Sequence, residues 1–152
     1  MTSRREILKH SAVVAGLLGT TGLFPQYANA AFNKVAFDAK SLADAYKALG
    51  IGLPVQSSGV VIQAPDIAEN GAVVPVGATS TLPGVKQILF LVEKNPLVLI
   101  AVFNLSDSVE ASILTRTKMA ESSNVYAVAV MNDGKVLYAK KEVKVTLGGC
   151  GG

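Results

Sequence analysis

The only cysteine of this 152-residue chain lies in a run of glycines, Gly148-Gly149-Cys150-Gly151-Gly152. Its thiol is the group in the chain best suited to covalent chemistry. Glycine has no Cβ and adopts both signs of φ, so residues 148–152 are predicted to form a flexible arm. A cysteine kept for packing would have apolar neighbours, and these glycines cannot bury one. We therefore expect Cys150 to be present for its reactivity.

Other interpretations of this segment are weaker. A frayed terminus with an incidental cysteine would also be rich in small residues. A prenylation signal has its cysteine fourth from the end and followed by aliphatic residues, whereas only two glycines follow Cys150. A closing Gly-Gly pair also occurs in sulfur carriers that form a thiocarboxylate, but those proteins work in the cytoplasm. The other end of this chain argues against that compartment.

The first residues resemble a twin-arginine export signal. Arg4 and Arg5 are followed by an apolar stretch over residues 12–24, and Ala28-Asn29-Ala30 fits a small-x-small cleavage site. The stretch is shorter than the roughly 20 residues that span a bilayer. We predict a signal peptide over residues 1–30 and a periplasmic product without a membrane anchor. An uncleaved anchor is the alternative.

Export restricts the chemistry open to the remaining chain. His10 is the only histidine and lies in the predicted signal, so Ser-His and Cys-His dyads and a typical zinc site are excluded afterwards. We expect neither enzymatic activity nor a bound cofactor. Losing the signal's basic residues leaves a nearly neutral chain, which does not favour nucleic-acid binding. An unpaired cysteine in an oxidising compartment indicates a reactive thiol or an intermolecular bond, and a disulfide-linked homodimer is expected in air.

Residues 31–147 are predicted to form one domain. Apolar spacing over residues 35–49 predicts an amphipathic helix, with Asp38 as its N-cap and Gly50 at its C-terminal stop. Short apolar segments separated by turn signals then predict six or seven strands, which favours an immunoglobulin-like antiparallel β-sandwich. The predicted strands cover residues 60–63, 72–76, 85–93, 97–105, 109–118, 125–131 and 135–147.

Three local features refine this prediction. Pro75 cannot donate to a strand ladder, so its strand is expected at an edge or bulge. Asn132-Asp133-Gly134 predicts a tight hairpin turn. Residues 97–103 and 125–130 are apolar at successive positions, so both faces of these strands need cover. We favour a tightly bound partner subunit as that cover over burial within the chain.

Three segments together resemble the SoxY family, the sulfur carriers of the bacterial thiosulfate-oxidising (Sox) system. They are the Arg4-Arg5 leader, Pro65-Asp66-Ile67-Ala68-Glu69-Asn70-Gly71-Ala72-Val73-Val74-Pro75-Val76 and the cysteine-containing glycine run. The resemblance extends over essentially the whole chain. It implies that Cys150 carries covalently attached sulfur intermediates, including a persulfide, on a swinging arm.

The resemblance also implies partners. A SoxZ-like subunit would form a heterodimer with the chain, and two kinds of Sox enzyme would bind transiently. A haem-containing enzyme would join thiosulfate oxidatively to the thiol, and a hydrolytic enzyme would release the terminal sulfone as sulfate. The chain would then be a covalent substrate of these enzymes.

Two other functions fit the residues without the resemblance. An exported immunoglobulin-like structural module would use Cys150 only to crosslink chains. A thiol-disulfide oxidoreductase would need a second cysteine, which the chain lacks. A free cysteine has a pKa near 8.5, so we expect this thiol to depend on the receiving enzymes for activation.

Overall fold

The computed structural model describes residues 33–149. The predicted signal peptide and Cys150–Gly152 lie outside the described residues. The elements in order are α2 (Lys34–Phe37), α3 (Leu42–Leu49), β1 (Val55–Gln56), β2 (Val60–Gln63), β3 (Ile67–Asn70), β4 (Val74–Ser80), β5 (Val85–Val92), β6 (Leu99–Asn104), β7 (Ser112–Thr117), β8 (Ser123–Met131) and β9 (Val136–Leu147). Among the described residues, no helix is both long and apolar enough to cross a bilayer.

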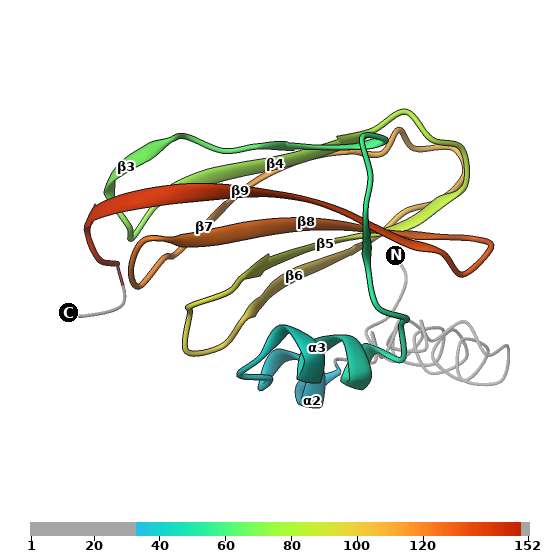
Figure 1. Cartoon of the computed structure of the whole chain (residues 1–152). Coiled ribbons are helices and arrows are strands. Elements are labelled where there is room, and N and C mark those ends of the chain that lie inside the picture. Colours follow the sequence, from blue (N-terminus) through green and yellow to red (C-terminus); the bar gives the residue numbers. More distant parts are fainter. Residues whose placement is uncertain (1–32, 150–152) are drawn as a thin grey trace, which may run out of the picture. The chain divides into compact units, whose positions relative to one another are not determined.

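The strands form two sheets that pack against each other as a β-sandwich (Figure 1). The larger sheet has the order β1-β9-β8-β5-β6, with β3 also paired to β9, and the smaller sheet has the order β2-β4-β7. The long strands pair antiparallel, and Gly134 has a φ of 85° in the predicted β8–β9 hairpin turn. The predicted mainly β, immunoglobulin-like sandwich with a small N-terminal helical part is confirmed.

The helical segment is two helices where the sequence predicted one. Asp38 ends α2, and the chain restarts as α3 with Ser41 as the N-cap, whose hydroxyl accepts a hydrogen bond from Asp44 N at 3.1 Å. The predicted N-cap at Asp38 is therefore wrong, because Ser41 can satisfy a free amide of the first turn of α3. Gly50 ends α3 in the left-handed conformation, with a φ of 68°, as expected for a glycine stop.

Two short strands were not predicted, and both run parallel to β9. Val55 of β1 pairs with Leu137, and Ala68 of β3 pairs with Val145. Pro75 occupies a stretch of β4 that pairs with β7 only, because the β2–β4 pairing stops at Gly77. The local edge expected for this proline is therefore present.

The core between the sheets is formed by alternate residues of the long strands. On the larger sheet, Ile88, Phe90 and Val92 of β5 face inward, each with a buried partner on β8. The smaller sheet contributes Val74 and Val76. This core holds the two sheets together by burial of apolar surface.

The opposite face of the larger sheet is covered by the two helices (Figure 1). Leu89 and Leu91 of β5 and Val128 of β8 are buried there against a helix layer that includes Ala45 and Tyr46. The apolar character of β8 on both faces is thus explained within the chain, whereas residues 100–103 of β6 are only half-buried. A bound partner subunit was favoured over burial within the chain as the cover for these strands, and the structure shows that the chain's own helices pack on this face instead.

Tyr46 makes this helix layer sensitive to alkaline pH. Its side chain is only 7% exposed, and burial, followed by the effects of Tyr126, Tyr138 and Glu93, raises its pKa to about 12. The fold therefore favours the neutral phenol, and this stabilisation is complete below the ordinary tyrosine pKa near 10. It is lost as the pH rises from about 10 to 12, at a cost on the order of 2 kcal/mol.

We expect Tyr46→Phe to remove most of that alkaline loss. Urea unfolding at a series of pH values up to 12 measures it. Equal losses of unfolding free energy in the wild type and the variant would show that the stability of this layer does not depend on the phenol.

Candidate functional site

The structure describes only part of the predicted site. Cys150, Gly151 and Gly152 lie outside the described residues, as do Arg4 and Arg5 of the predicted export signal. Gly148 and Gly149 are described and follow directly on β9. The geometry of the site is therefore that of the base of the predicted arm.

Backbone hydrogen bonds hold the base of the arm. Leu147 O accepts from Gly71 N at 2.7 Å, Gly71 O accepts from Met119 N at 2.7 Å, and Met119 O accepts from Gly149 N at 2.8 Å. A flexible segment was predicted from Gly148 onward, and the backbone of Gly149 is bonded to the body. Freedom of the chain beyond Gly149 stays a prediction.

The two diagnostic segments of the family resemblance meet at this base. Residues 65–76 contain β3, which pairs in parallel with the end of β9, so that Asn70 lies opposite Leu147. The Asn70 side chain accepts a hydrogen bond from Ala72 N at 2.8 Å, which turns the chain sharply after β3. The turn places Gly71 beside the residues that follow β9.

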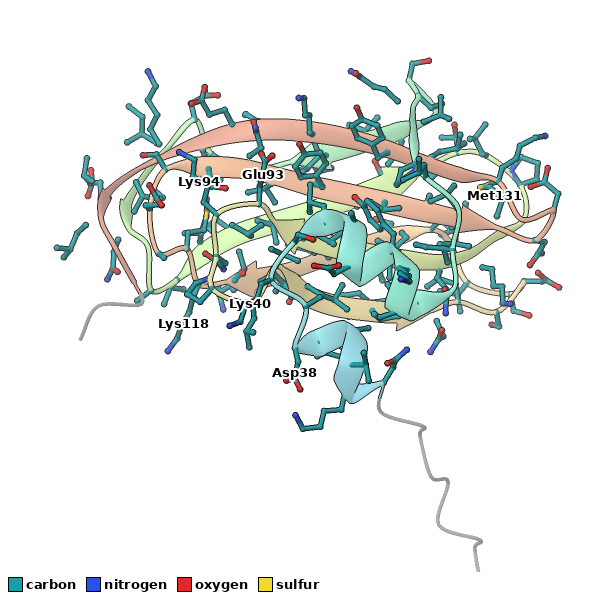
Figure 2. All side chains as sticks on the ribbon, turned by 60° about the horizontal axis from the view of Figure 1, so that its bottom comes forward. Asp38, Lys40, Glu93, Lys94, Lys118 and Met131 are labelled. Atoms are coloured by element: carbon teal, nitrogen blue, oxygen red, sulfur yellow. The ribbon has the colours of Figure 1, made fainter. Side chains whose placement is uncertain are left out.

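Charged side chains of both signs surround this end of the sandwich. Figure 2 shows Lys94 and Lys118 at the end where β9 finishes, far from Met131. Lys94 Nζ lies 3.8 Å from a carboxylate oxygen of Glu121, whereas Lys118 has no carboxylate partner among residues 33–149. Lys118 is therefore a cation at this end that is available to an anionic group.

Glu93 faces the helix-covered side of the same end. Its carboxylate accepts from Asn124 Nδ2 at 2.8 Å and from the Tyr126 hydroxyl at 3.4 Å. Burial, followed by the charge of Glu93, raises the pKa of Tyr126, so its phenol stays a hydrogen-bond donor. This carboxylate is thus occupied by neighbouring donors.

Metal binding finds no support in the part of the chain that the structure describes. Between residues 33 and 149, no group of three His, Cys, Asp or Glu side chains is arranged to hold a metal ion. What the arrangement offers instead is a fixed position for Gly149, the residue before Cys150. The body of the sandwich thus holds the residue that directly precedes Cys150 in the sequence.

The roles of Asn70, Gly71 and Asn95 at the base were not predicted from the sequence. Asn70 and Gly71 directly precede the strand predicted over residues 72–76, and Asn95 lies between the strands predicted over residues 85–93 and 97–105. Asn95 is 9% exposed, and its side chain bonds to the backbone on both sides of Met119. A turn asparagine and a buried, bridging asparagine look alike in sequence, so no local signal separates them.

Comparison with known proteins gives one family and a set of solved folds. Residues 46–150 match the family model for sulfur oxidation protein SoxY. The sulfur carrier protein SoxY from Chlorobium limicola f. thiosulfatophilum is 35% identical, with a TM-score of 0.63 over 70% of this chain and 97% of that one. No curated protein was found to match the chain.

More distant solved structures share the fold alone. A superoxide reductase (neelaredoxin) variant from Ignicoccus hospitalis is 20% identical, with a TM-score of 0.51 over 57% of this chain and 78% of that one. A putative superoxide reductase from Thermotoga maritima is 14% identical, with a TM-score of 0.51 over 60% of this chain and 93% of that one. These likenesses carry no information on chemistry.

Proposed function

The chain belongs to the SoxY family of sulfur oxidation proteins, and from this we propose that it carries sulfur intermediates covalently on Cys150 during thiosulfate oxidation. The observation that carries the proposal is the match of residues 46–150 to the family model, which ends on this cysteine. The similarity to a solved SoxY sulfur carrier supports it.

The chemistry of such a carrier takes two steps. In the first, the Cys150 thiol and thiosulfate form a sulfur–sulfur bond, giving a cysteine S-thiosulfonate, one proton and two electrons, and the haem-containing partner accepts the electrons. In the second, water attacks the terminal sulfone, the sulfur–sulfur bond to that group breaks, and sulfate and a proton leave. A persulfide remains on Cys150. The chain is a covalent substrate in both steps and not the catalyst.

The described residues contribute to this chemistry by holding the segment that precedes Cys150. Gly149, the residue before Cys150, is bonded to Met119 at one end of the sandwich, and Lys118 lies at the same end without a carboxylate partner among the described residues. A thiosulfonate adduct is anionic, so we propose that the ammonium group of Lys118 favours it. No resident cofactor is needed, since the sulfur is carried on the side chain itself.

We also propose a SoxZ-like partner subunit and transient contacts with the haem-containing and hydrolytic enzymes. Support for these partners comes from family membership. The apolar second face of the larger sheet does not add support, because α2 and α3 cover it. Periplasmic location by the twin-arginine route is likewise a proposal, and it rests on the sequence of residues 1–30.

Intact-mass spectrometry of the protein from cells supplied with thiosulfate tests the proposed function. We expect sulfur adducts that dithiothreitol removes and that are absent from Cys150→Ser. The structural alternative predicts a persistent disulfide-linked dimer without added sulfur. A bare chain mass under every sulfur supply would contradict the carrier function.

A further inference from the structure

Three segments that are distant in sequence meet at the end of β9. They are the β3–β4 turn at Gly71, the connection between β7 and β8 at Met119, and the residues after β9 at Gly149, all at one end of the sandwich (Figure 1). The hydrogen bonds described above link Leu147, Gly71, Met119 and Gly149 in one continuous backbone chain. We call this arrangement the arm junction.

The arm junction is closed so tightly that its glycines have no room for a side chain. A Cβ on Gly71 would overlap Met119 O and lie 2.8 Å from Gly149 N. A Cβ on Gly149 would overlap the backbone of Gly71 and Ala72. Because the obstructing atoms are backbone atoms, neither clash can be relieved by a side-chain rotation. Gly71 and Gly149 are thus needed for close approach, and flexibility is not required to explain them.

A buried asparagine fixes the segment around Met119, whose carbonyl oxygen accepts the hydrogen bond from Gly149 N. Asn95, in the connection between β5 and β6, donates from Nδ2 to Lys118 O at 2.8 Å and accepts at Oδ1 from Ala120 N at 3.0 Å. These two bonds bracket Met119, whose side chain is fully buried. Asn95 therefore sets the position of the carbonyl that receives Gly149 N.

A second side chain fixes β9 just before the junction. Ser122 Oγ accepts a hydrogen bond from Val145 N at 2.9 Å. The end of β9 is thus bonded to β3 on one side and to the segment that follows Met119 on the other. The hold on the arm comes from the body of the sandwich and does not depend on the arm's own conformation.

We propose that the arm junction anchors the carrier arm at Gly149, so that Cys150 is the first residue beyond the anchor, and that Gly71, Asn95 and Gly149 are positioning residues for sulfur loading. This inference rests on the proposed function for its role in sulfur transfer. Its structural part, the hold on Gly149, stands on the hydrogen bonds and the steric fit.

The anchor has a consequence for partner enzymes. An arm free from Leu147 would carry its thiol roughly 10 Å from the body when extended, at about 3.3 to 3.6 Å per residue, whereas an arm anchored at Gly149 has about one residue of reach. An enzyme acting on Cys150 must then bind close to the loops that form the junction. The anchor limits the directions from which the thiol can be approached.

The test compares Gly71→Ala and Asn95→Ala with two matched controls in the full mature chain. Gly52→Ala makes the same change where a Cβ meets nothing within 4 Å, and Asn124→Ala removes an amide that bonds only to the exposed Glu93 side chain. Amide hydrogen exchange at Gly149, measured by NMR, shows how stably its N–H is bonded to Met119 O. Thiol reaction with a small aromatic disulfide reports access, and loading with thiosulfate by the haem-containing partner reports positioning.

We expect amide exchange at Gly149 to be about tenfold faster in both junction variants, as for the loss of one or two backbone hydrogen bonds. Their rate constant for enzymatic loading should fall about tenfold, because the thiol is presented less precisely. Reaction with the small reagent should stay within about twofold of wild type, since a small molecule does not need the thiol to be presented from one direction. The controls should match wild type in all three measurements.

Two results would overturn the inference. Unchanged exchange at Gly149 in folded Asn95→Ala would show that the junction does not hold the arm. Faster exchange with unchanged enzymatic loading would show that the hold does not position the thiol. If Gly71→Ala fails to fold, Asn95→Ala decides alone. A wild-type protein that is never loaded, but whose Gly149 exchange responds as expected, would refute the proposed function while confirming the hold.

Discussion

Replacing Cys150 with serine is expected to abolish sulfur loading completely. A serine hydroxyl cannot form the sulfur–sulfur bond to thiosulfate, and the chain has no second cysteine to take over. Because the residue follows the described body, the fold should be unaffected. Thiosulfate-dependent electron transfer to the haem-containing partner should fall to the level seen without this chain.

The control for this variant is its own stability. Cys150→Ser should unfold at the same denaturant concentration as the reduced wild type, which separates loss of chemistry from loss of structure. A reductant-sensitive sulfur adduct on Cys150→Ser, or normal turnover with it, would show that another group carries the sulfur.

Phe90→Ala is expected to have the largest effect on stability. Phe90 is 0% exposed at the centre of β5, and its ring meets that of Phe103 edge to face, with centroids 6.1 Å apart. Its loss removes buried apolar surface and leaves a cavity that cannot collapse between two sheets, at a cost of about 3 to 5 kcal/mol. This is a large share of the roughly 5 to 15 kcal/mol that stabilises a typical domain. Urea unfolding measures the change.

Leu114→Ala is the matched control for that truncation. Leu114 lies on β7 and is 77% exposed, so its removal should change the unfolding free energy by less than about 0.5 kcal/mol. Comparable losses in the two variants would contradict the described core between the sheets. Folded Phe90→Ala molecules should still be loaded at Cys150, because the arm junction is formed by other residues.

Local patterns were sufficient to predict most strands. The Asn132-Asp133-Gly134 turn and the apolar runs on either side of it correspond to the β8–β9 hairpin, because both signals act between neighbours in sequence. Strand β3 was missed for the opposite reason. Its partner is the end of β9, so Ala68 pairs with a residue far along the chain. Its four residues carry no alternation that would mark a strand by themselves.

Packing between layers was beyond what the sequence could show. The apolar run in β8 correctly indicated that both faces are covered, but not by what. The helix pair covers the outer face because Ala36, Ala45 and Tyr46 pack against it, and this depends on how the chain turns at residues 38–41. A cover from within the chain and a cover from a partner leave the same pattern in the strands.

The glycines of the arm show a similar limit. Gly148 and Gly149 were predicted to make the arm flexible, which stays a prediction, and the structure adds a close backbone contact between Gly149 and Gly71. A glycine that provides backbone flexibility and a glycine that permits close backbone contact cannot be told apart in the sequence. Only the position of the residues that it meets, here 71–72 and 119, distinguishes the two.

The most direct test follows isotopically labelled sulfur onto the cysteine. The wild-type protein is incubated with its Sox partners and thiosulfate labelled at the outer, sulfane sulfur, and the peptide containing Cys150 is analysed by mass spectrometry. We expect the label on Cys150, still present after sulfate has been released and removed by reductant. A peptide that stays unlabelled while thiosulfate is consumed would contradict a carrier function for this chain.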